Sequence, residues 1–286
     1  MLSVIIVNYN AGDLLLGCVE MVLASSKVKQ VIVVDNASRD DSFKRVRRLA
    51  GDQRLQLIEN QKNLGFSRAN NMAMEKLRTE SRYILFLNPD CEMSEGVAGR
   101  LLDFMENNED VGMSTCLVAN PDGSEQRGCR RHIPDLGNTL AALFPWSKTA
   151  CRHDFNLSET PLPSAPVEVE AISGSFMFVR RTVIEAIGGF DEGYFLHCED
   201  LDLCKRIGLA GWKIMFVPDV RIVHHQGVCS QARPLKVSWH KHCGMRRFFH
   251  KFYRKHYGFP LSLLVTAAIW FHFVLEIPQK LLVDRS

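Results

Sequence analysis

The sequence predicts an α/β protein whose core is a mostly parallel sheet flanked by helices. Two observations carry this prediction. Short apolar runs alternate with segments of helical periodicity through residues 2–119. These runs are apolar along their whole length, as expected of parallel strands that are covered on both faces.

Four strand-and-helix units open the chain. We expect strands at residues 2–7, 31–34, 55–58 and 83–87, and helices at residues 14–22, 41–50, 67–77 and 95–107. Polar residues follow the strands, among them Asn8, Asp35, Asn88 and Asp90. Because ligands of open α/β sheets bind beyond the carboxyl ends of the strands, these residues mark the expected ligand crevice.

The second half of the chain is less regular. A strand is expected at residues 111–119, and residues 120–166, which carry six prolines, predict loops and short helices. Regular structure then returns, with strands expected at 167–172, 176–179, 213–217 and 220–223 and helices at 182–187 and 199–209.

Composition limits the possible classes of function. The chain has 286 residues, 46% of them apolar and 23% charged, which is ordinary for a folded protein. A net charge of +3 gives no indication of nucleic-acid binding. The nine cysteines form no CxxC pair, and we expect reduced, mostly buried thiols in a cytosolic protein. The chain opens directly on strand-like residues, so no secretory signal is predicted.

The last part of the chain, residues 233–286, predicts a basic and apolar helical extension. No Asp or Glu occurs from Ile222 to Pro260, where Lys and Arg are frequent, and the fifteen residues 261–275 include only three polar ones. We favour an interfacial helix at an anionic membrane surface. A helix packed on the domain or a partner subunit is the second interpretation, and a membrane span, for which the run is short, is the third.

Two carboxylates at strand ends, Asp35 and Asp90, are the first candidates for chemistry. An Asp in such a place can accept hydrogen bonds from a nucleobase or ribose, or can bind a divalent ion. The alternative is a turn-forming Asp, which is common after strands.

A second acidic group, Glu199, Asp200 and Asp202, falls in the first turn of an expected helix. Carboxylates that lie beside apolar residues can serve as general bases, and apolar residues precede this group. The alternative is that the helix dipole alone favours acids in a first turn.

His224 and His225 end an expected strand and could bind metal or be structural. The sequence has no GxGxxG, GxxxxGK[ST] or GxSxG motif, which disfavours dinucleotide binding, P-loop chemistry and a serine hydrolase.

In their order along the chain, these pieces resemble glycosyltransferase family 2, and most of all its bacterial rhamnosyltransferase-type members. The resemblance covers about residues 2–258. Each motif alone is weak, but the ordered set is specific. The motifs are SVIIVNYN at 3–10, VVDNAS at 33–38, NLGF at 63–66, NN at 70–71, FLNPD at 86–90, GSFM at 174–177, GGFDE at 188–192, EDLDL at 199–203, VPD at 217–219, HH at 224–225 and, more weakly, YRKHYG at 253–258.

The resemblance implies a GT-A fold in residues 1–232, with a nucleotide-sugar-binding half at 1–119 and an acceptor and catalytic half at 120–232. It implies an inverting transfer in which Asp200 is the catalytic base and Glu199 orients it. Asp35 would contact the base of the donor, and Asn8 and Gly65 would line the nucleotide pocket.

The resemblance also implies a bound Mg²⁺ or Mn²⁺. The segment Asn88-Pro89-Asp90 takes the place of the family's acidic metal-binding motif, with Asp90 as the ligand and Asn88 where many relatives have Asp. His224 would be the second protein ligand, and His225 is the less favoured choice.

The expected activity is therefore sugar transfer from a nucleotide diphosphate, best L-rhamnose from dTDP-rhamnose, to a hydroxyl of a glycan or polyprenyl-linked glycan in cell-surface polysaccharide synthesis. We expect peripheral membrane contact through the C-terminal segment, at the cytoplasmic face of the cell membrane. A sugar nucleotidyltransferase and a non-catalytic glycan- or membrane-binding module are the alternatives.

Overall fold

The sheet that the sequence predicts is present in the computed structural model, which describes residues 1–135, 155–225 and 234–283. Its first four parallel strands lie in the order β3-β2-β1-β4. Every residue of β1 and β4 is buried, which explains why their sequences are mostly apolar. The strands are β1 (Leu2–Asn8), β2 (Val28–Asp35), β3 (Leu55–Glu59) and β4 (Tyr83–Leu87).

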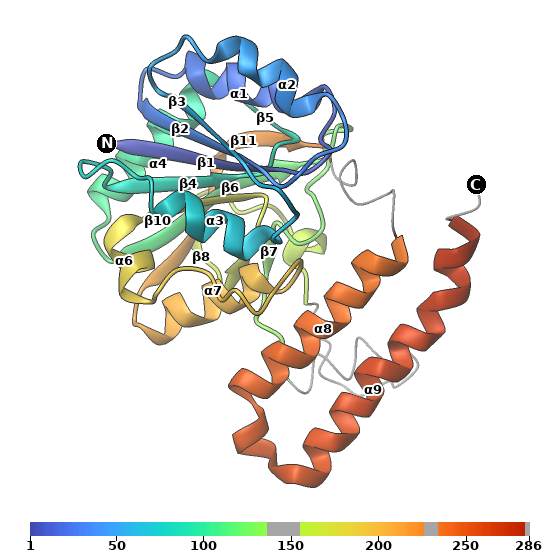
Figure 1. The fold of residues 1–286 in the computed structure, drawn as a ribbon. Helices are drawn as coiled ribbons and strands as arrows, with labels where there is room; N and C mark the ends of the chain where they lie inside the picture. The colour runs from blue at the N-terminus through green and yellow to red at the C-terminus, as the bar shows by residue number, and fades with distance from the viewer. Residues whose placement is uncertain (136–154, 226–233, 284–286) are drawn as a thin grey trace.

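Helices cover both faces of this sheet. Helices α1 and α2 lie on one face, and α3 and α7 lie on the other (Figure 1). The expected helix at 41–50 is a short α-helix followed by a 3-10 turn. The helices of this domain are α1 (Leu14–Ala24), α2 (Ser42–Val46), η1 (Arg47–Leu49), α3 (Phe66–Met74), α4 (Glu95–Asn107), η2 (Leu157–Glu159), α6 (Arg181–Ala186) and α7 (Glu199–Leu209).

The second half of the chain completes the same sheet. Strand β10 (Phe176–Arg180) runs antiparallel between β4 and β6 (Val111–Ala119), and β11 (Lys213–His224) runs parallel to β6. The sheet is thus mixed but mostly parallel. The predicted halves, 1–119 and 120–232, both contribute strands to it.

Four short strands, β5, β7, β8 and β9, depart from the sequence-based expectation. The single strand expected at 167–172 is two: β8 (Val167–Glu168) pairs with β11, and β9 (Ala171–Ile172) pairs with β7 (Arg130–Arg131) in a separate sheet. Strand β5 (Cys91–Met93) was not predicted, and it pairs antiparallel with the end of β11. Each is only two or three residues long, too short to show a periodic pattern.

Strand β11 is continuous where two strands were expected. Its register on β6 shifts between Val217 and Arg221, which leaves the intervening residues, including Pro218, out of the ladder. Proline has no N–H to donate, so a bulge is a natural place for it in a strand. Beyond the bulge the strand continues to His224, which pairs with Cys91 of β5.

The C-terminal extension is a helical hairpin that projects from the sheet domain (Figure 1). It consists of α8 (Pro234–Phe252) and α9 (Arg254–Val283), and the predicted boundary at 232–233 falls outside the described residues. Helix α8 is attached to the domain by ion pairs from Arg247 to Asp191 and from Lys251 to Asp191 and to the buried Asp202. The hairpin therefore contacts α7 and the loop before it.

Helix α9 packs on α8 but leaves much of its apolar surface exposed. Its inner face contributes Val265 and Ile269 to a small cluster with Phe249 of α8. The segment Arg254–Leu281 is long and apolar enough to cross a membrane, with mean hydropathy 1.8 and only 17% of its most apolar window buried. Large exposed apolar side chains on it are Phe259, Leu263, Leu264, Phe271, Val274, Leu275 and Leu281.

Candidate active site

Asp90 and His224 meet at the carboxyl end of the sheet. Asp90 follows β4, and His224 is the last residue of β11. The pairing of β5 with β11 brings them together, and the His225 N–H donates to the Asp90 carbonyl at 2.9 Å. His224 Nε2 lies 3.1 Å from Asp90 Oδ1, and both side chains are buried. A carboxylate and an imidazole at this separation are a common pair of metal ligands.

The ring of His224 is oriented by Gln126. His224 Nδ1 lies 2.6 Å from Gln126 Oε1, while Gln126 Nε2 donates to Asn120 Oδ1 at 3.1 Å and to the His224 carbonyl at 3.3 Å. Because the Gln126 amide already has acceptors for its N–H groups, its oxygen faces the ring and accepts from Nδ1–H. This tautomer leaves a lone pair on His224 Nε2, directed at Asp90.

The neighbouring side chains differ in their fitness as ligands. Asn88 Nδ2 lies 3.2 Å from His224 Nε2, so Asn88 also lies at this point. Cys91 lies within ligand distance of Asp90 and His224, but burial raises the pKa of its thiol well above the ordinary value, so the thiol stays protonated. His225 points elsewhere, with Nε2 at 2.7 Å from Glu92. Of the two histidines, only His224 faces Asp90.

Asp200 lies in the first turn of α7 and is held from three sides. Its Oδ2 forms an ion pair with Arg131 of β7 and accepts the Gly174 N–H at 3.2 Å, and its Oδ1 accepts the Leu201 N–H at 2.8 Å. A Cβ at position 174 would lie 3.3 Å from the Asp200 Cβ, so glycine allows this close approach. The side chain of Asp200 is fixed, with one face left to solvent.

Glu199, next to Asp200, is buried, and its Oε2 has no hydrogen-bond partner. Burial, reinforced by the charge of Asp200, raises its pKa to about 8. The two residues before it, His197 and Cys198, both adopt a left-handed backbone with φ of 69°. Such a conformation is costly for residues other than glycine and clusters at functional sites.

One short segment joins the two groups of residues. Gly174 donates to Asp200, and the next residue, Ser175, accepts the Asn88 N–H through its carbonyl at 2.9 Å. The loop that leads into β10 thus contacts both Asn88, two residues before Asp90, and Asp200. A candidate metal site and a candidate base are therefore linked through one short segment.

The residues at the ends of β1 and β2 form a second polar group. The Asn8 amide donates to Asp35 Oδ1 at 2.7 Å and to Ser42 Oγ at 2.8 Å. Asp35 also accepts from the Ser38 hydroxyl at 2.6 Å and the Ser38 N–H at 2.9 Å. Both Asn8 and Asp35 are almost fully buried. The hydrogen bonds of Asn8 therefore fix the position of the Asp35 side chain and of the loop after β2.

Gly65 begins α3 and touches the loop that precedes α7. Its φ is +85°, and a Cβ there would lie 2.7 Å from the Phe195 carbonyl oxygen. The Phe66 N–H donates to that same oxygen at 2.9 Å, and the Gly65 carbonyl accepts from Asn36. Only glycine fits both the conformation and the contact. Gly65 thus connects the Asp35 loop to the segment that carries Asp200.

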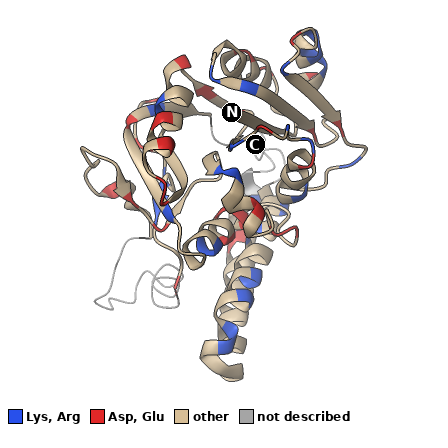
Figure 2. Ribbon diagram, turned by 90° about the vertical axis from the view of Figure 1, so that its left-hand side faces the viewer, with Lys and Arg blue, Asp and Glu red and all other residues tan. Residues whose placement is uncertain are grey.

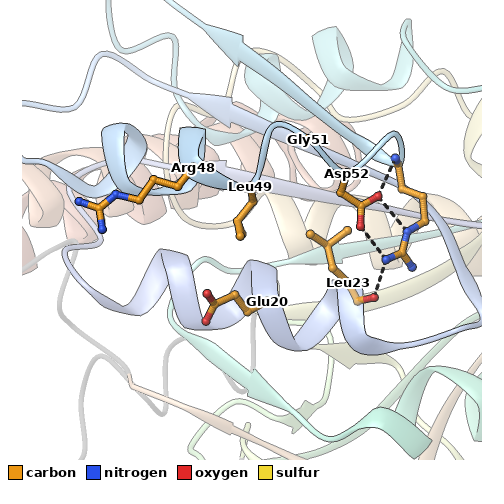
Figure 3. A pocket seen from close by; sticks show the side chains of 7 residues that line it. Glu20, Leu23, Arg48, Leu49, Gly51 and Asp52 are labelled. Carbon is orange, nitrogen blue, oxygen red and sulfur yellow. Dashed lines mark hydrogen bonds and ion pairs between the residues drawn. The ribbon is translucent and has the colours of Figure 1, made fainter.

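A separate hollow of about 450 Å³ lies between α1 and the segment after η1. Figure 3 shows Glu20, Leu23, Arg48, Leu49, Gly51 and Asp52 around it. Its Arg54 is already paired with Asp52 at 2.7 Å. None of the site residues predicted from the sequence lines it, so it has no part in the crevice.

Sequence reasoning missed two residues of the site, Gln126 and Arg131. Both lie in the irregular segment after β6, where neither periodicity nor a motif draws attention to them. No pattern in the sequence distinguishes them, because most residues between 120 and 135 are exposed or half-buried and only a few, among them Gln126 and Arg130, are nearly inaccessible.

Comparison with known proteins assigns the chain to a family. A sequence model described as glycosyl transferase family 2 matches residues 3–188, well over half of the chain. The chain belongs to glycosyl transferase family 2. It is accordingly a glycosyltransferase, and the expectation drawn from the ordered motifs is confirmed.

Curated members of the family that resemble this chain include rhamnosyltransferases. The N-acetylglucosaminyl-diphospho-decaprenol L-rhamnosyltransferase of Mycobacterium tuberculosis is 30% identical over 246 residues, which cover 79% of this chain and 76% of that protein. The rhamnosyltransferase WbbL of Escherichia coli K12 is 28% identical over 201 residues, 67% of either chain.

Solved structures agree on the GT-A fold. The Pyrobaculum calidifontis mannosyltransferase PcManGT, in complex with GDP-Man and Mn²⁺, matches 99% of this chain and 72% of its own with a TM-score of 0.60 at 18% identity. GalNAc-T7 with UDP, GalNAc and Mn²⁺ matches 95% of this chain and 55% of its own with a TM-score of 0.58 at 16% identity. The predicted fold class is confirmed.

Proposed function

We propose that this glycosyltransferase moves L-rhamnose from dTDP-rhamnose to a hydroxyl of a polyprenyl-diphosphate-linked glycan, with inversion at the anomeric carbon. The donor sugar and the class of acceptor rest on the rhamnosyltransferases to which the chain is similar. The observation that carries the reaction is the joint placement of the Asp90–His224 pair and Asp200 around the loop at Gly174.

We place a divalent cation, Mg²⁺ or Mn²⁺, between Asp90 and His224. The fit rests on the lone pair of His224 Nε2, which Gln126 directs at a carboxylate oxygen 3.1 Å away. Two acceptor atoms at this separation repel one another unless a cation or a proton lies between them. When bound, the ion would neutralise charge on the diphosphate leaving group. One carboxylate is enough for such a site, because phosphates and waters supply the other ligands.

Asp200 is the proposed base. Its carboxylate would accept the proton of the acceptor hydroxyl as that oxygen forms a bond to the anomeric carbon. The bond from the anomeric carbon to the diphosphate oxygen breaks in the same displacement, and the nucleoside diphosphate leaves. Arg131 and Gly174 hold Asp200 in place, and they would also stabilise its ionised form before the reaction.

Glu199 is proposed to position Asp200 rather than to react. Its raised pKa of about 8 keeps it neutral at pH 7, which avoids a second negative charge beside the base.

Asp35 is proposed to contact the nucleobase. A carboxylate accepts about four hydrogen bonds. Asp35 uses three within the protein, so one acceptor position is left on Oδ2.

The hairpin of α8 and α9 is proposed to hold the enzyme on the cytoplasmic face of a membrane rich in anionic lipids. The exposed apolar side chains of α9 would enter the interface, and Lys and Arg would contact the head groups. Figure 2 shows Lys and Arg along the hairpin. No Asp or Glu occurs between residues 222 and 275. An enzyme held there would meet a polyprenyl-linked acceptor at the membrane surface.

The direct test is transfer from a panel of nucleotide sugars to N-acetylglucosaminyl-diphospho-polyprenol in vesicles, followed by mass spectrometry of the lipid. The proposal predicts that dTDP-rhamnose alone adds a deoxyhexose. Transfer from a UDP- or GDP-sugar instead would contradict the proposed donor. NMR of the product gives the anomeric configuration, and retention would contradict the proposed displacement.

A further inference from the structure

A polar cluster lies between the two helices of the hairpin, remote in sequence from the crevice. His242 of α8 faces His272 and Glu276 of α9, and His242 is fully buried. His242 Nε2 lies 3.0 Å from His272 Nδ1, which in turn lies 3.7 Å from Glu276 Oε1. Each residue thus offers one ligand atom, and the three atoms all lie within 4.8 Å of one another.

Ser238 fixes the orientation of two of these groups. Its carbonyl lies 2.8 Å from His242 Nδ1 and accepts that N–H, so the lone pair of a neutral His242 ring is on Nε2, toward α9. The Ser238 hydroxyl donates to Glu276 Oε2 at 2.7 Å, which leaves Oε1 toward the imidazoles. Metal-binding histidines and carboxylates are typically held by such outer hydrogen bonds.

Two of the three spacings between these atoms are close to those of a tetrahedral ion. At metal–ligand distances of about 2.0–2.2 Å, tetrahedral ligands lie roughly 3.3–3.6 Å apart. The two distances of 3.0 and 3.7 Å lie on either side of this range. His272 and Glu276 are four residues apart on α9, so one turn of helix presents both to the same point. A hydrogen bond between the two imidazoles would account for their contact, and Glu276 is also held by the Ser238 hydroxyl and by Lys241, whose Nζ lies 4.0 Å from Oε1.

We propose that His242, His272 and Glu276 form a zinc site that fastens α9 to α8. Two imidazoles and one carboxylate are a ligand set typical of Zn²⁺, and nitrogen ligands disfavour Mg²⁺. The aromatic rings of Trp239, Trp270 and Phe273 pack beside the cluster, and the Phe273 ring centroid lies 5.3 Å from that of His242. The site would be structural and would fix the register of the hairpin, separately from the cation proposed at Asp90.

The test measures zinc retained by the full-length protein in an Asp90→Ala background, so that the crevice does not contribute. The protein is loaded with Zn²⁺, desalted and analysed by mass spectrometry of the metal. About one equivalent is expected, and His272→Gln or Glu276→Gln should remove most of it. His250→Gln is the matched control, because His250 also joins α8 to α9, through Thr266, but has no part in the cluster.

A second readout does not depend on the His272 and Glu276 variants folding. Co²⁺ added to the Asp90→Ala protein should give the intense visible absorption of a tetrahedral site, and added Zn²⁺ should abolish it and raise the melting temperature. Zinc retained equally by His272→Gln and His250→Gln proteins, each with native circular dichroism, would overturn the proposal. Absence of both bound zinc and tetrahedral Co²⁺ absorption in the Asp90→Ala parent would overturn it as well.

Discussion

His224 Nε2 lies 3.1 Å from Asp90 Oδ1, although 134 residues separate them in the chain. Three features of the fold produce this contact. Strand β5 begins directly after Asp90, β11 runs one residue beyond its last pair with β6 to reach His224, and Gln126 selects the tautomer of the ring. The proposed cation site therefore depends on a residue, Gln126, that touches neither the cation nor the substrate.

Replacing Gln126 with Leu should weaken metal binding without unfolding the protein. The His224 ring would lose the acceptor that holds Nδ1–H, and loss of such an outer partner typically costs about 10–100-fold in metal affinity. Titration of nucleotide-loaded protein with Mn²⁺ measures the change. His225→Gln is the control, since its ring pairs with Glu92 outside the site. Equal Mn²⁺ affinity in the Gln126→Leu and wild-type proteins would rule out this role.

Asp200→Asn should lower kcat by about 10²–10⁴, because the amide cannot accept the proton of the acceptor hydroxyl. Affinity for the nucleotide should stay within a few-fold of wild type, since Asp200 is bound to Arg131, Gly174 and Leu201 and not to Asp90 or His224. Kinetics with a saturating donor measure both values. Glu185→Gln, an exposed acid paired with Arg181, is the control. Wild-type kcat in Asp200→Asn would exclude Asp200 as the base.

Glu199 should make the stability of the protein depend on pH. Its pKa is about 8 in the folded state, above its value of 4.5 without the environment of the fold. A raised pKa means that the folded state holds the proton more tightly, so this stability is fully present below about pH 4.5 and is lost as the pH rises through about 8. The Glu199→Gln variant cannot ionise at this position, so it does not lose this stability as the pH rises. Its melting temperature should rise relative to wild type between about pH 5 and 9, and parallel curves would refute the assignment.

The exposed face of α9 should govern membrane binding. Changing Phe259, Leu263 and Leu264 to Ser removes apolar surface that the fold leaves exposed, and the variant should lose most of its sedimentation with anionic vesicles. Leu209→Ser, at an equally exposed apolar position on α7, should bind as wild type does. Removal of all residues after Tyr257 should release the protein too; unchanged sedimentation of both altered forms would contradict the proposed anchor.

The first half of the fold was predictable because β1, β2 and β4 are buried almost along their whole length. Strands β1 and β4 are mostly apolar in sequence, and polar residues follow or close each of them. The expectation of reduced, mostly buried thiols agrees with the described cysteines, because six of the seven are buried and all seven are free. Cys151 and Cys229 lie outside the described residues.

The rest of the site could not be predicted because it depends on contacts between distant segments. The ion pair of Arg131 with Asp200 requires β7 to pair with β9, and neither strand exceeds two residues. The burial that raises the pKa of Glu199 comes from tertiary packing. The sequence cannot reveal it, because an exposed acid in a first helical turn has the same local sequence pattern. The hydrogen bonds that leave Asp35 one free acceptor position are likewise visible only in the fold.

The central claim is that Asp90 and His224 hold a divalent cation that binds the donor diphosphate. Calorimetric binding of dTDP in the presence of Mn²⁺ or EDTA tests it most directly, with wild type, Asp90→Ala, His224→Gln and His225→Gln proteins. We predict tight binding by wild type and His225→Gln with Mn²⁺, and at least about tenfold weaker binding with EDTA or in the other two variants. Binding of dTDP that is unchanged by EDTA and by loss of Asp90 would contradict the claim.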